Sequence, residues 1–297
     1  MRTSQIAEDA VAASAPRTTK ERLRAHGITP RKRLGQCFLL SDRDAARIAD
    51  LAQVAPDDVV VEVGAGTGVL TAPLAERARA VVAVEVDRRL QDLLVERFGG
   101  TANVEIAREN YVRLDLTKIA RDRGVGKLLV VGNLPYYITT EILLHTLEAR
   151  AAVSRMVVMV QREVAQRLLA PPGGKEYGSL TVFVRYHAEV DRLMEVRKGA
   201  FYPEPEVSST LIELRFRLAP PIDIEDEALF FTVVRSAFQM RRKMLGGSLA
   251  DTLGLPRESL AAAMVERGVA PTRRPEELDI DGFESVARAV AAVRANG

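Results

Sequence analysis

Val59-Val-Val-Glu-Val-Gly-Ala-Gly-Thr-Gly68 is the stretch that decides how this chain folds. Its first half, Val59–Val63, consists of β-branched valines around one glutamate and predicts a buried strand. Glycines then stand at alternating positions from Gly64, which predicts a tight turn, and a helix is expected to begin near Val69. Such a turn lets the main chain approach a ligand at the N-terminus of the following helix. The stretch therefore predicts a strand–turn–helix unit that binds a ligand at its turn.

Apolar β-branched runs alternate with amphipathic stretches along the chain after this unit. The runs predicted as strands are Val81–Val86, Val104–Ile106, Leu128–Val131 and Met156–Val160, and the predicted helices between them include Arg88–Phe98 and Thr140–Arg150. Short apolar runs separated by helices are typical of buried parallel strands. The pattern predicts an α/β fold with a Rossmann-like, mostly parallel sheet.

The C-terminal part of the chain has a different pattern. Two runs, Ser179–Tyr186 and Ser209–Phe216, have no helix-length stretch between them and predict an antiparallel hairpin at one sheet edge. After Pro220–Pro221 the pattern is helical at Glu227–Met240, Arg257–Arg267 and Asp281–Arg294. We therefore expect a mobile N-terminal tail over residues 1–20, an α/β domain over 21–218 and a small all-α domain over 219–297.

Composition limits the classes of protein to which this chain can belong. Hydrophobic residues make up 47% of the 297 residues and charged residues 28%, as in globular proteins. The lone cysteine, Cys37, has no second cysteine for an internal disulfide, and His26, His145 and His187 have no ligand spacing, so no metal site is expected. No apolar run of about 18 residues and no secretory signal is seen, so we expect a cytoplasmic protein.

An acidic residue follows the second strand of the predicted sheet. Glu85 comes 21 residues after Gly64, where a carboxylate can accept hydrogen bonds from ribose hydroxyls. A dinucleotide fingerprint would need its third glycine at position 69, which is Val69. The spacing, with Glu62 before it, instead resembles the S-adenosylmethionine (SAM) loop of class I methyltransferases. The alternative is an ordinary glycine turn beside a solvated carboxylate.

The tetrapeptide Asn133-Leu134-Pro135-Tyr136 follows the predicted strand Leu128–Val131 directly. An exocyclic amine such as N6 of adenine is a poor nucleophile, because its lone pair is delocalised into the ring. The side-chain carbonyl of Asn133 and the main-chain carbonyl of Leu134 can accept its two N–H bonds and favour the transition state as positive charge develops. Pro135 stiffens the turn, and Tyr136 offers a face on which a base can stack. The alternative is an ordinary turn with Tyr136 in the core.

These motifs together resemble the rRNA adenine N6-dimethyltransferases, most closely the members that modify the small ribosomal subunit. The resemblance runs from about Arg31 to about Arg274, nearly the whole folded chain. The matching pieces, in order, are Arg31–Leu39, the glycine turn, Glu85, Asn133–Tyr136, Lys175–Leu180, Phe201–Val207 and Ala237–Lys243. The resemblance implies a class I SAM-dependent methyltransferase fold with a small helical domain, and SAM as the cofactor.

The resemblance also implies roles for single residues. The SAM contacts would be Cys37, Leu39, Gly64, Gly66, Glu85, Asn110 and Asn133, and the target adenine would be held by Asn133, Leu134, Pro135 and Tyr136, with Phe201 covering its other face. Two positions depart from the family pattern: Cys37 stands where Asn is usual, and Asn110 where Asp is usual. Both changes are expected to weaken cofactor binding, because a thiol is a poor hydrogen-bonding group and an amide lacks charge.

Basic residues are concentrated in two places, although the net charge is only +2. Seven basic residues and one acid lie between Arg17 and Arg33, and four basic residues and no acid lie between Ala228 and Ala250. The candidate RNA contacts are Arg31, Lys32, Arg33, Arg241, Arg242 and Lys243. Such clusters suit RNA phosphates, and the alternative is a solvated helix face.

The hypothesis from sequence is thus a monomeric enzyme that dimethylates N6 of adenines in small-subunit ribosomal RNA during ribosome maturation. A large-subunit rRNA methyltransferase of the macrolide-resistance type is the alternative within the family. A DNA adenine methyltransferase is disfavoured, because such enzymes usually carry Pro where this chain has Leu134. An alternative of another class is a catalytically weak ribosome-assembly or RNA-binding factor, for which Cys37 and Asn110 are the support.

Overall fold

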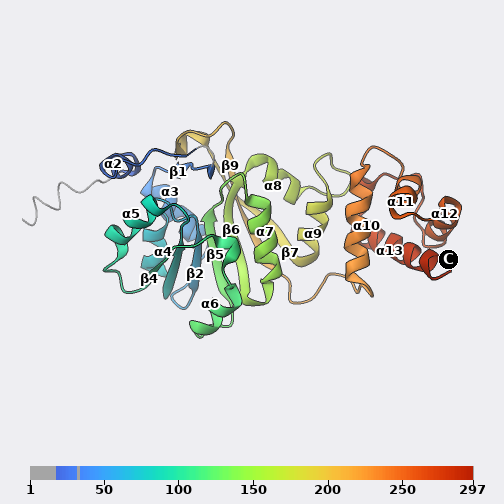
Figure 1. Ribbon diagram of the computed structural model, residues 1–297, viewed down its shortest axis with the longest axis horizontal. Coiled ribbons are helices and arrows are strands. Elements are labelled where there is room, and N and C mark those ends of the chain that lie inside the picture. The colour runs from blue at the N-terminus through green and yellow to red at the C-terminus, as the bar shows by residue number, and fades with distance from the viewer. Residues whose placement is uncertain (1–17, 32–33, 297) are drawn as a thin grey trace, which may run out of the picture. The chain divides into compact units, whose positions relative to one another are not determined.

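The computed structural model, which describes residues 18–31 and 34–296, contains a seven-stranded sheet (Figure 1). The strand order is β4 (Val104–Ala107), β3 (Ala80–Val84), β2 (Val59–Val63), β5 (Leu128–Asn133), β6 (Val153–Gln161), β9 (Ser209–Phe216) and β7 (Ala188–Val196). The five strands from β4 to β6 pair in parallel. The predicted strand Val59–Val63 is confirmed as β2, in which every residue is buried.

The strand order places a crevice at a defined point of the sheet. From β2 the chain goes outward to β3 and β4 and then returns to β5 on the other side of β2, with Val63 paired to Gly132. In open α/β sheets, ligands bind outside the carboxyl ends of the strands at such a reversal of order. The glycine turn after β2 and Asn133 at the end of β5 therefore share one crevice.

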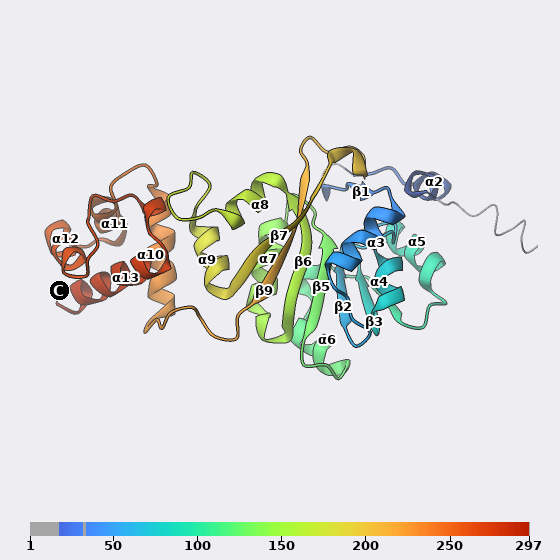
Figure 2. The same ribbon diagram turned by 180° about the vertical axis from the view of Figure 1, so that it is seen from behind.

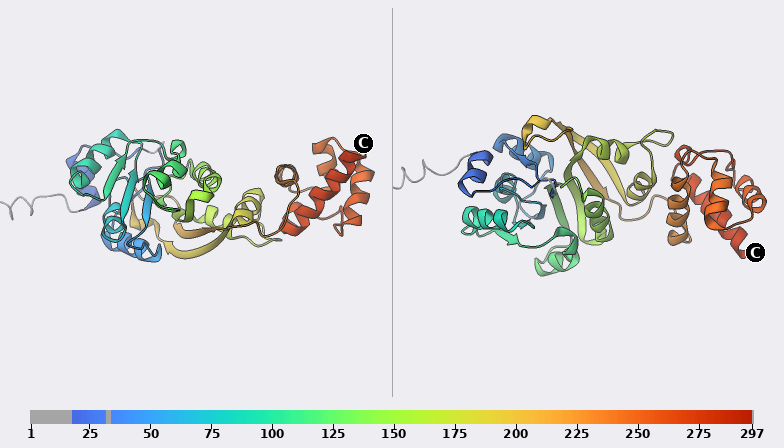
Figure 3. Two further views of the ribbon diagram at one scale, coloured as in Figure 1. Left: turned by 90° about the horizontal axis from the view of Figure 1, so that it is seen from below. Right: turned by 45° about the horizontal axis from the view of Figure 1, so that its top comes forward.

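Helices lie on both faces of the sheet, as the views from opposite sides show (Figures 1 and 2), and the layers can be followed from below in Figure 3. They are α3 (Asp42–Leu51), α4 (Thr71–Arg77), α5 (Arg88–Phe98), α6 (Leu116–Asp122) and α7 (Thr139–Glu148), with the short turn η2 (Tyr111–Arg113). The helices predicted at Arg88–Phe98 and Thr140–Arg150 are thus confirmed. Two covered faces explain why the parallel strands are apolar on both sides.

The N-terminal segment begins with a short helix rather than a tail at residue 18. Thr18 caps α2 (Thr19–Ala25), and its hydroxyl accepts from the main-chain N–H of Glu21. The tail predicted over residues 1–20 is therefore wrong for residues 18–20, and its remainder lies outside the described residues. After α2 the chain reaches β1 (Phe38–Leu39), which pairs antiparallel with β8 (Phe201–Tyr202).

The edge of the sheet differs from the predicted hairpin. Residues Ser179–His187 form helix α9, and the strand that pairs with β9 follows it as β7. Val182 and Tyr186, one helical turn apart, are both buried in one hydrophobic cluster with Phe230. This packing stabilises a helix and outweighs the β-branched composition that favoured a strand. The strand Ser209–Phe216 is confirmed as β9.

Two compact units divide the chain differently from the predicted boundary near residue 219. Unit 1 comprises the chain up to residue 162 and residues 192–214, and unit 2 comprises residues 163–191 and 215–297. The helices assigned mainly to unit 2 are α8 (Arg162–Leu169), α9, α10 (Glu227–Gln239), α11 (Leu245–Leu253), α12 (Arg257–Glu266) and α13 (Ile280–Ala295). Unit 2 takes in α9 because Tyr177, Val182 and Tyr186 share a core with the C-terminal helices.

The helices predicted at Glu227–Met240, Arg257–Arg267 and Asp281–Arg294 are confirmed as α10, α12 and α13. Helix α11, whose sequence begins Leu-Gly-Gly, was not expected, because glycine disfavours helix formation. Within the described ranges, no helix combines the length and the apolar character that a membrane crossing requires.

Candidate active site

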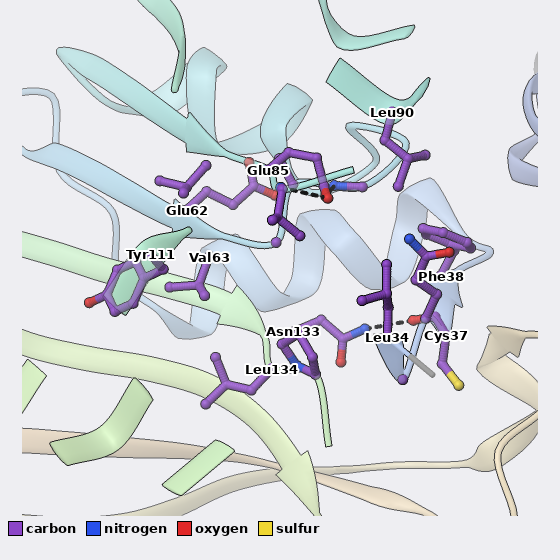
Figure 4. A pocket seen from close by; sticks show the side chains of 18 of the residues that line it. Leu34, Cys37, Phe38, Glu62, Val63, Glu85, Leu90, Tyr111, Asn133 and Leu134 are labelled. Atoms are coloured by element: carbon purple, nitrogen blue, oxygen red, sulfur yellow. Dashed lines mark hydrogen bonds between the residues drawn. The ribbon is translucent and has the colours of Figure 1, made fainter. Parts of the chain in front are cut away.

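A pocket opens at the crevice between β2 and β5. It is lined by the segment Leu34–Leu39, by the glycine turn after β2 and by the residues that end β3 and β5. Figure 4 shows Glu62, Glu85, Tyr111 and Asn133 arranged around it, with Leu34 and Phe38 on one side. The predicted site residues that line this pocket are Cys37, Leu39, Gly64, Gly66, Glu85, Asn110, Asn133, Leu134, Pro135 and Tyr136.

The glycine turn and Glu85 form one end of the pocket. Gly66 has a φ of +57°, and a Cβ atom there would lie 3.1 Å from the Phe38 ring, so the turn needs glycine at this point. The main-chain N–H of Gly66 donates to Oε2 of Glu85 at 2.9 Å, while Val86 and Asp87 donate to Oε1 at 2.9 and 2.8 Å. A carboxylate has about four acceptor positions, so Oε2 keeps one for a ligand hydroxyl.

Burial and main-chain contacts act in opposite directions on Glu85. Its side chain is buried, which raises the pKa of the carboxyl, and the three N–H donors oppose that shift. Because the donors hold both oxygens in place, the carboxylate is a pre-oriented acceptor rather than the solvated strand-end group that was the alternative reading. The apolar residues Val86 and Leu90 line the pocket beside it, as a purine ring requires.

Glu62 lies deeper, at the end of β2. It is 1% exposed, and the hydroxyl of Thr71, the first residue of α4, donates to its Oε2 at 2.6 Å. Burial raises the pKa of Glu62 to about 7, and the negative charge of Glu85 adds to that shift. The Glu62 carboxyl is therefore a neutral acid over part of the physiological pH range.

Asn133 ends β5 with its amide fixed. Its Nδ2 donates to the main-chain carbonyl of Cys37 at 2.8 Å (Figure 4). Since the amide is planar, this bond leaves its oxygen Oδ1 as the free acceptor. The arrangement therefore agrees with the predicted use of Asn133, in which the oxygen accepts an N–H from an exocyclic amine.

The next three residues form a rigid turn that lines the pocket. The N–H of Leu134 donates to the carbonyl of Met159 on β6 at 3.0 Å, and the Pro135 carbonyl accepts from the hydroxyl of Thr139 at 3.0 Å. The hydroxyl of Tyr136 lies 3.2 Å from the Ser209 hydroxyl. Tyr136 is half-buried and lines the pocket, which leaves its ring available for stacking. The roles predicted for these residues stay predictions that this geometry permits.

The two residues that depart from the family pattern make their hydrogen bonds differently, Asn110 through its side chain and Cys37 through its main chain. Asn110 lines the pocket and caps η2, since its Oδ1 accepts from the N–H of Val112 at 3.4 Å. Cys37 touches Asn133 through its main-chain carbonyl, whereas its sulfur points away from the Asn133 amide (Figure 4) and its side chain packs against an apolar cluster. The Cys37 thiol therefore occupies a position where a polar side chain is not needed to hold Asn133.

Phe201 is the predicted base-contacting residue that does not line the pocket. It lies in β8 opposite Leu39 and is 2% exposed. Both residues belong to the same buried apolar cluster. This is the position of a core aromatic side chain. Its stacking role stays a prediction, and it would require the ring to leave that cluster.

The candidate RNA contacts differ in whether their side chains already bind other groups of the protein. Arg31 lies 3.8 Å from Asp87, and Lys32 and Arg33 lie outside the described residues. Arg241 donates to the main-chain carbonyls of Gly174 and Lys175 and lies 3.8 Å from Glu276, so it is held by the protein itself. Arg242 and Lys243 are exposed. The RNA contact predicted for Arg241, Arg242 and Lys243 stays a prediction.

Sequence reasoning missed Gln36 and Asp87, although both are near predicted residues. Gln36 Nε2 donates to Asp87 Oδ2 at 3.0 Å across 51 residues of sequence. An acidic residue two positions after Glu85, together with a glutamine in the segment before Phe38, was the available signal. Pairing over such a separation cannot be read from a local pattern.

The pocket's chemistry fits SAM. A buried carboxylate with one open acceptor position suits a ribose hydroxyl, a glycine turn leaves room for the main chain to approach, and an asparagine oxygen lies at the opposite end. Within residues 18–31 and 34–296, no three His, Cys, Asp or Glu side chains are grouped so that they could hold a metal ion.

The sequence is similar to those of known RNA methyltransferases. Residues 27–291 match the profile of the family described as ribosomal RNA adenine dimethylase. The "Ribosomal RNA small subunit methyltransferase A" of Moorella thermoacetica is 42% identical over 279 residues, covering 92% of this chain and 96% of that protein. A protein of the same name from Desulfitobacterium hafniense is 44% identical over 264 residues, covering 89% and 93%.

Solved structures share the fold. A 23S rRNA methyltransferase, ErmE, superposes with a TM-score of 0.66 at 28% identity, covering 86% of this chain and 99% of that chain. A dimethyladenosine transferase from Plasmodium falciparum gives a TM-score of 0.71 at 22% identity, covering 84% and 95%. The predicted Rossmann-like sheet with an antiparallel edge and C-terminal helices is thereby confirmed.

Proposed function

The chain belongs to the ribosomal RNA adenine dimethylase family, and we propose that it methylates N6 of adenines in small-subunit ribosomal RNA, with SAM as methyl donor. Relatives at 42% and 44% identity over about nine-tenths of the chain carry the small-subunit name. A ribosomal substrate implies action in the cytoplasm, and we expect the chain to act as a monomer. The two methyl transfers would occur at the same pocket.

The observation that carries the proposal is the fixed amide of Asn133. Because its Nδ2 is held by the Cys37 carbonyl at 2.8 Å, its oxygen is oriented before any substrate arrives. The Asn133 oxygen and the Leu134 carbonyl would accept the two hydrogens of an adenine amine, and Tyr136 would support the ring. These acceptors stabilise the amine nitrogen as it gains positive charge, which is where preorganised groups lower the barrier most.

Glu85 would bind the ribose of the cofactor, and Asn110 would bind the adenine of the cofactor. The main chain of Gly64 and Gly66 would lie against the cofactor between them. When bound, SAM supplies an electrophilic methyl group on a sulfonium that leaves readily. Among the described residues, no histidine or lysine lines the pocket, and the Asn133 oxygen cannot take a proton at neutral pH. We expect the proton released by the methylated amine to go to water.

The test is methylation of immature small ribosomal subunits by the purified protein with labelled SAM, followed by mapping of the modified nucleotides. We expect dimethylated adenines in the small-subunit RNA. A parallel incubation with large-subunit RNA tests the alternative that the 28% identity to a 23S rRNA methyltransferase favours. Label in large-subunit RNA alone would overturn the choice of substrate, and absence of label with SAM binding intact would favour the assembly-factor alternative.

A further inference from the structure

Asp87 is a buried carboxylate that binds Gln36, a residue of the Leu34–Leu39 segment that lines the pocket. Its side chain is 1% exposed, and it caps α5 by accepting from the N–H of Arg89. The Arg89 guanidinium donates through Nη2 to Oδ2 at 2.6 Å and through Nε to Oδ1 at 3.1 Å. Gln36 donates to Oδ2 at 3.0 Å, and the Arg31 guanidinium lies 3.8 Å away. Asp87 therefore joins the start of α5 to Gln36, within the Leu34–Leu39 segment, and to Arg31, which precedes that segment.

Both ends of the Gln36 amide are used in this contact. Its Nε2 donates to Asp87, and its Oε1 accepts from the main-chain N–H of Arg31 at 2.8 Å. Arg89 holds the same stretch a second time, since its Nη1 donates to the Thr29 carbonyl at 3.3 Å. The main chain at Thr29 and Arg31, which precede Gln36, is thus tied to α5.

The neighbour of Gln36 makes the contact that matters for the reaction. The carbonyl of Cys37 accepts from Nδ2 of Asn133 at 2.8 Å, so the position of this carbonyl decides which way the Asn133 oxygen faces. Continuous contacts therefore run from Asp87 through Gln36 and the Cys37 main chain to Asn133. The N–H of Asp87 also donates to Glu85, so the same residue touches the proposed ribose acceptor.

We propose that Asp87 is a positioning residue for methyl transfer, which holds the segment at Gln36 so that the Cys37 carbonyl keeps the Asn133 oxygen turned toward the amine. The proposal rests on the proposed function, in which Asn133 accepts an amine hydrogen. Charge is required of Asp87, because one carboxylate serves Arg89, Gln36 and a main-chain N–H together. The hydrogen bonds from Arg89 hold the pKa of Asp87 at about 2, so the group is ionised at neutral pH.

The test is Asp87→Asn, which retains a helix cap for α5 but weakens the contacts with Arg89 and Gln36. We expect the single-turnover rate at saturating SAM and RNA to fall about 10- to 100-fold, because small misplacement of a reacting group has effects of this size. Asp50→Asn is the matched control, since Asp50 accepts from Nε and Nη2 of Arg77 at 3.1 and 2.9 Å and does not line the pocket. An equal rate per folded molecule in the two variants would overturn the proposal.

A double-mutant cycle tests whether Asp87 acts through Asn133. In an Asn133→Ala background, Asp87→Asn should lower the rate no further, because the group that it positions is gone. A second loss of the same size would overturn the proposal. If Asp87→Asn does not fold, Gln36→Leu removes the same tether while leaving the Asp87–Arg89 pair, and the same lower rate is expected.

A rescue variant completes the design. Gln36→Glu combined with Asp87→Asn exchanges the amide and the carboxylate, so the new amide can donate to the new carboxylate, which can still accept from the main-chain N–H of Arg31. We expect this pair to recover at least part of the lost rate, and no recovery in a folded protein would count against the proposal. Methylation of adenine by the unaltered protein is measured first with labelled SAM. If that protein transfers no methyl group, the proposed function fails, and this outcome is distinct from a failure of the role proposed for Asp87.

Discussion

Asn133 uses the two ends of its amide for different purposes, which makes it a sharp test of the site. Asn133→Ala should lower methyl transfer about 10²- to 10³-fold, as expected when one preorganised polar group is lost from a transition state. The rate is measured with labelled SAM on immature subunits, alongside the melting temperature. We expect the fold to be retained, since Asn133 is only partly buried.

Asn103→Ala is the matched control for that variant. The Asn103 amide also donates to main-chain carbonyls, those of Ala75 at 2.8 Å and Ala78 at 3.2 Å, and it does not line the pocket. It should lower stability while leaving turnover per folded molecule near normal. Near-normal turnover in Asn133→Ala would show that the tetrapeptide does not hold the base.

Asn110 has an amide where the family usually has a carboxylate. Because Val112 engages Oδ1, the other end of this amide is an NH2 group, whereas Asp would keep a charged oxygen there. Asn110→Asp should therefore tighten SAM binding by about 1 kcal/mol, or a few-fold in Kd. Calorimetric titration of SAM measures the change, and weaker binding would mean that the pocket has adapted to the amide.

Cys37→Asn is expected to help less than the sequence comparison alone implied. The Cys37 side chain packs against an apolar cluster, and its contact with Asn133 is made by the main chain. An amide packed against that cluster would lose part of its hydrogen bonding with water, which offsets any new contact with the cofactor. In the same titration, a Kd within about threefold of the original protein is expected; a gain equal to that of Asn110→Asp would contradict this account.

At the scale of elements, Glu62 joins the end of β2 to the start of α4 through Thr71. Burial raises the pKa of Glu62 from its ordinary value of 4.5 to about 7 in the folded chain. Between these values the folded chain binds more protons than the unfolded chain, so the free energy of unfolding falls as the pH rises. From pH 5 to pH 8 the loss at this residue should be about 2.5 kcal/mol, because each pH unit over which the folded chain holds one more proton corresponds to about 1.4 kcal/mol.

Glu62→Gln isolates this contribution, since glutamine stays neutral and can still accept from Thr71. Urea unfolding of both proteins at pH 5, 6, 7 and 8 measures the difference. The variant should gain stability relative to the original protein as the pH rises. A difference that is the same at every pH would show that Glu62 is not buried as a neutral acid.

In the chain taken as a whole, the three basic residues predicted to contact RNA differ in how far they are held by the protein itself. Arg242 and Lys243 are exposed, whereas Arg241 binds main-chain carbonyls of unit 2. Changing Arg242 and Lys243 together to Ala should weaken RNA binding and flatten the slope of log Kd against log salt by about 0.7–0.9 for each phosphate that the variant no longer neutralises. Filter binding over a salt series measures the slope.

Arg257→Ala is the control for the charge change. Arg257 is 68% exposed but is paired with Asp251 at 2.6 Å, so its removal should leave the slope unchanged. An unchanged slope in the Arg242/Lys243 variant as well would identify that part of the cluster as a solvated face. Arg241→Ala should instead lower the stability of unit 2, because two main-chain carbonyls would lose their donor.

Short-range patterns explain what could be predicted from the sequence. The strand Val59–Val63, the turn beginning at Gly64 and the helix Arg88–Phe98 all follow from residue periodicity and glycine conformation within about ten residues. The tetrapeptide from Asn133 to Tyr136 carries its chemistry in four adjacent residues. Family resemblance and function could therefore be inferred before the structure, because motif and spacing are themselves local.

Features that depend on residues far apart in the sequence could not be predicted from local patterns. Ser179–His187 is a helix because its apolar face packs with residues of the C-terminal helices, although its composition favours a strand. Gln36 meets Asp87 across 51 positions, and the Cys37 carbonyl meets Asn133 across 96, so no local pattern could reveal that these contacts orient the amide. Local sequence thus specifies which chemical groups the site contains, whereas long-range packing sets how they are held, because side-chain orientation depends on contacts that form only when the whole unit folds.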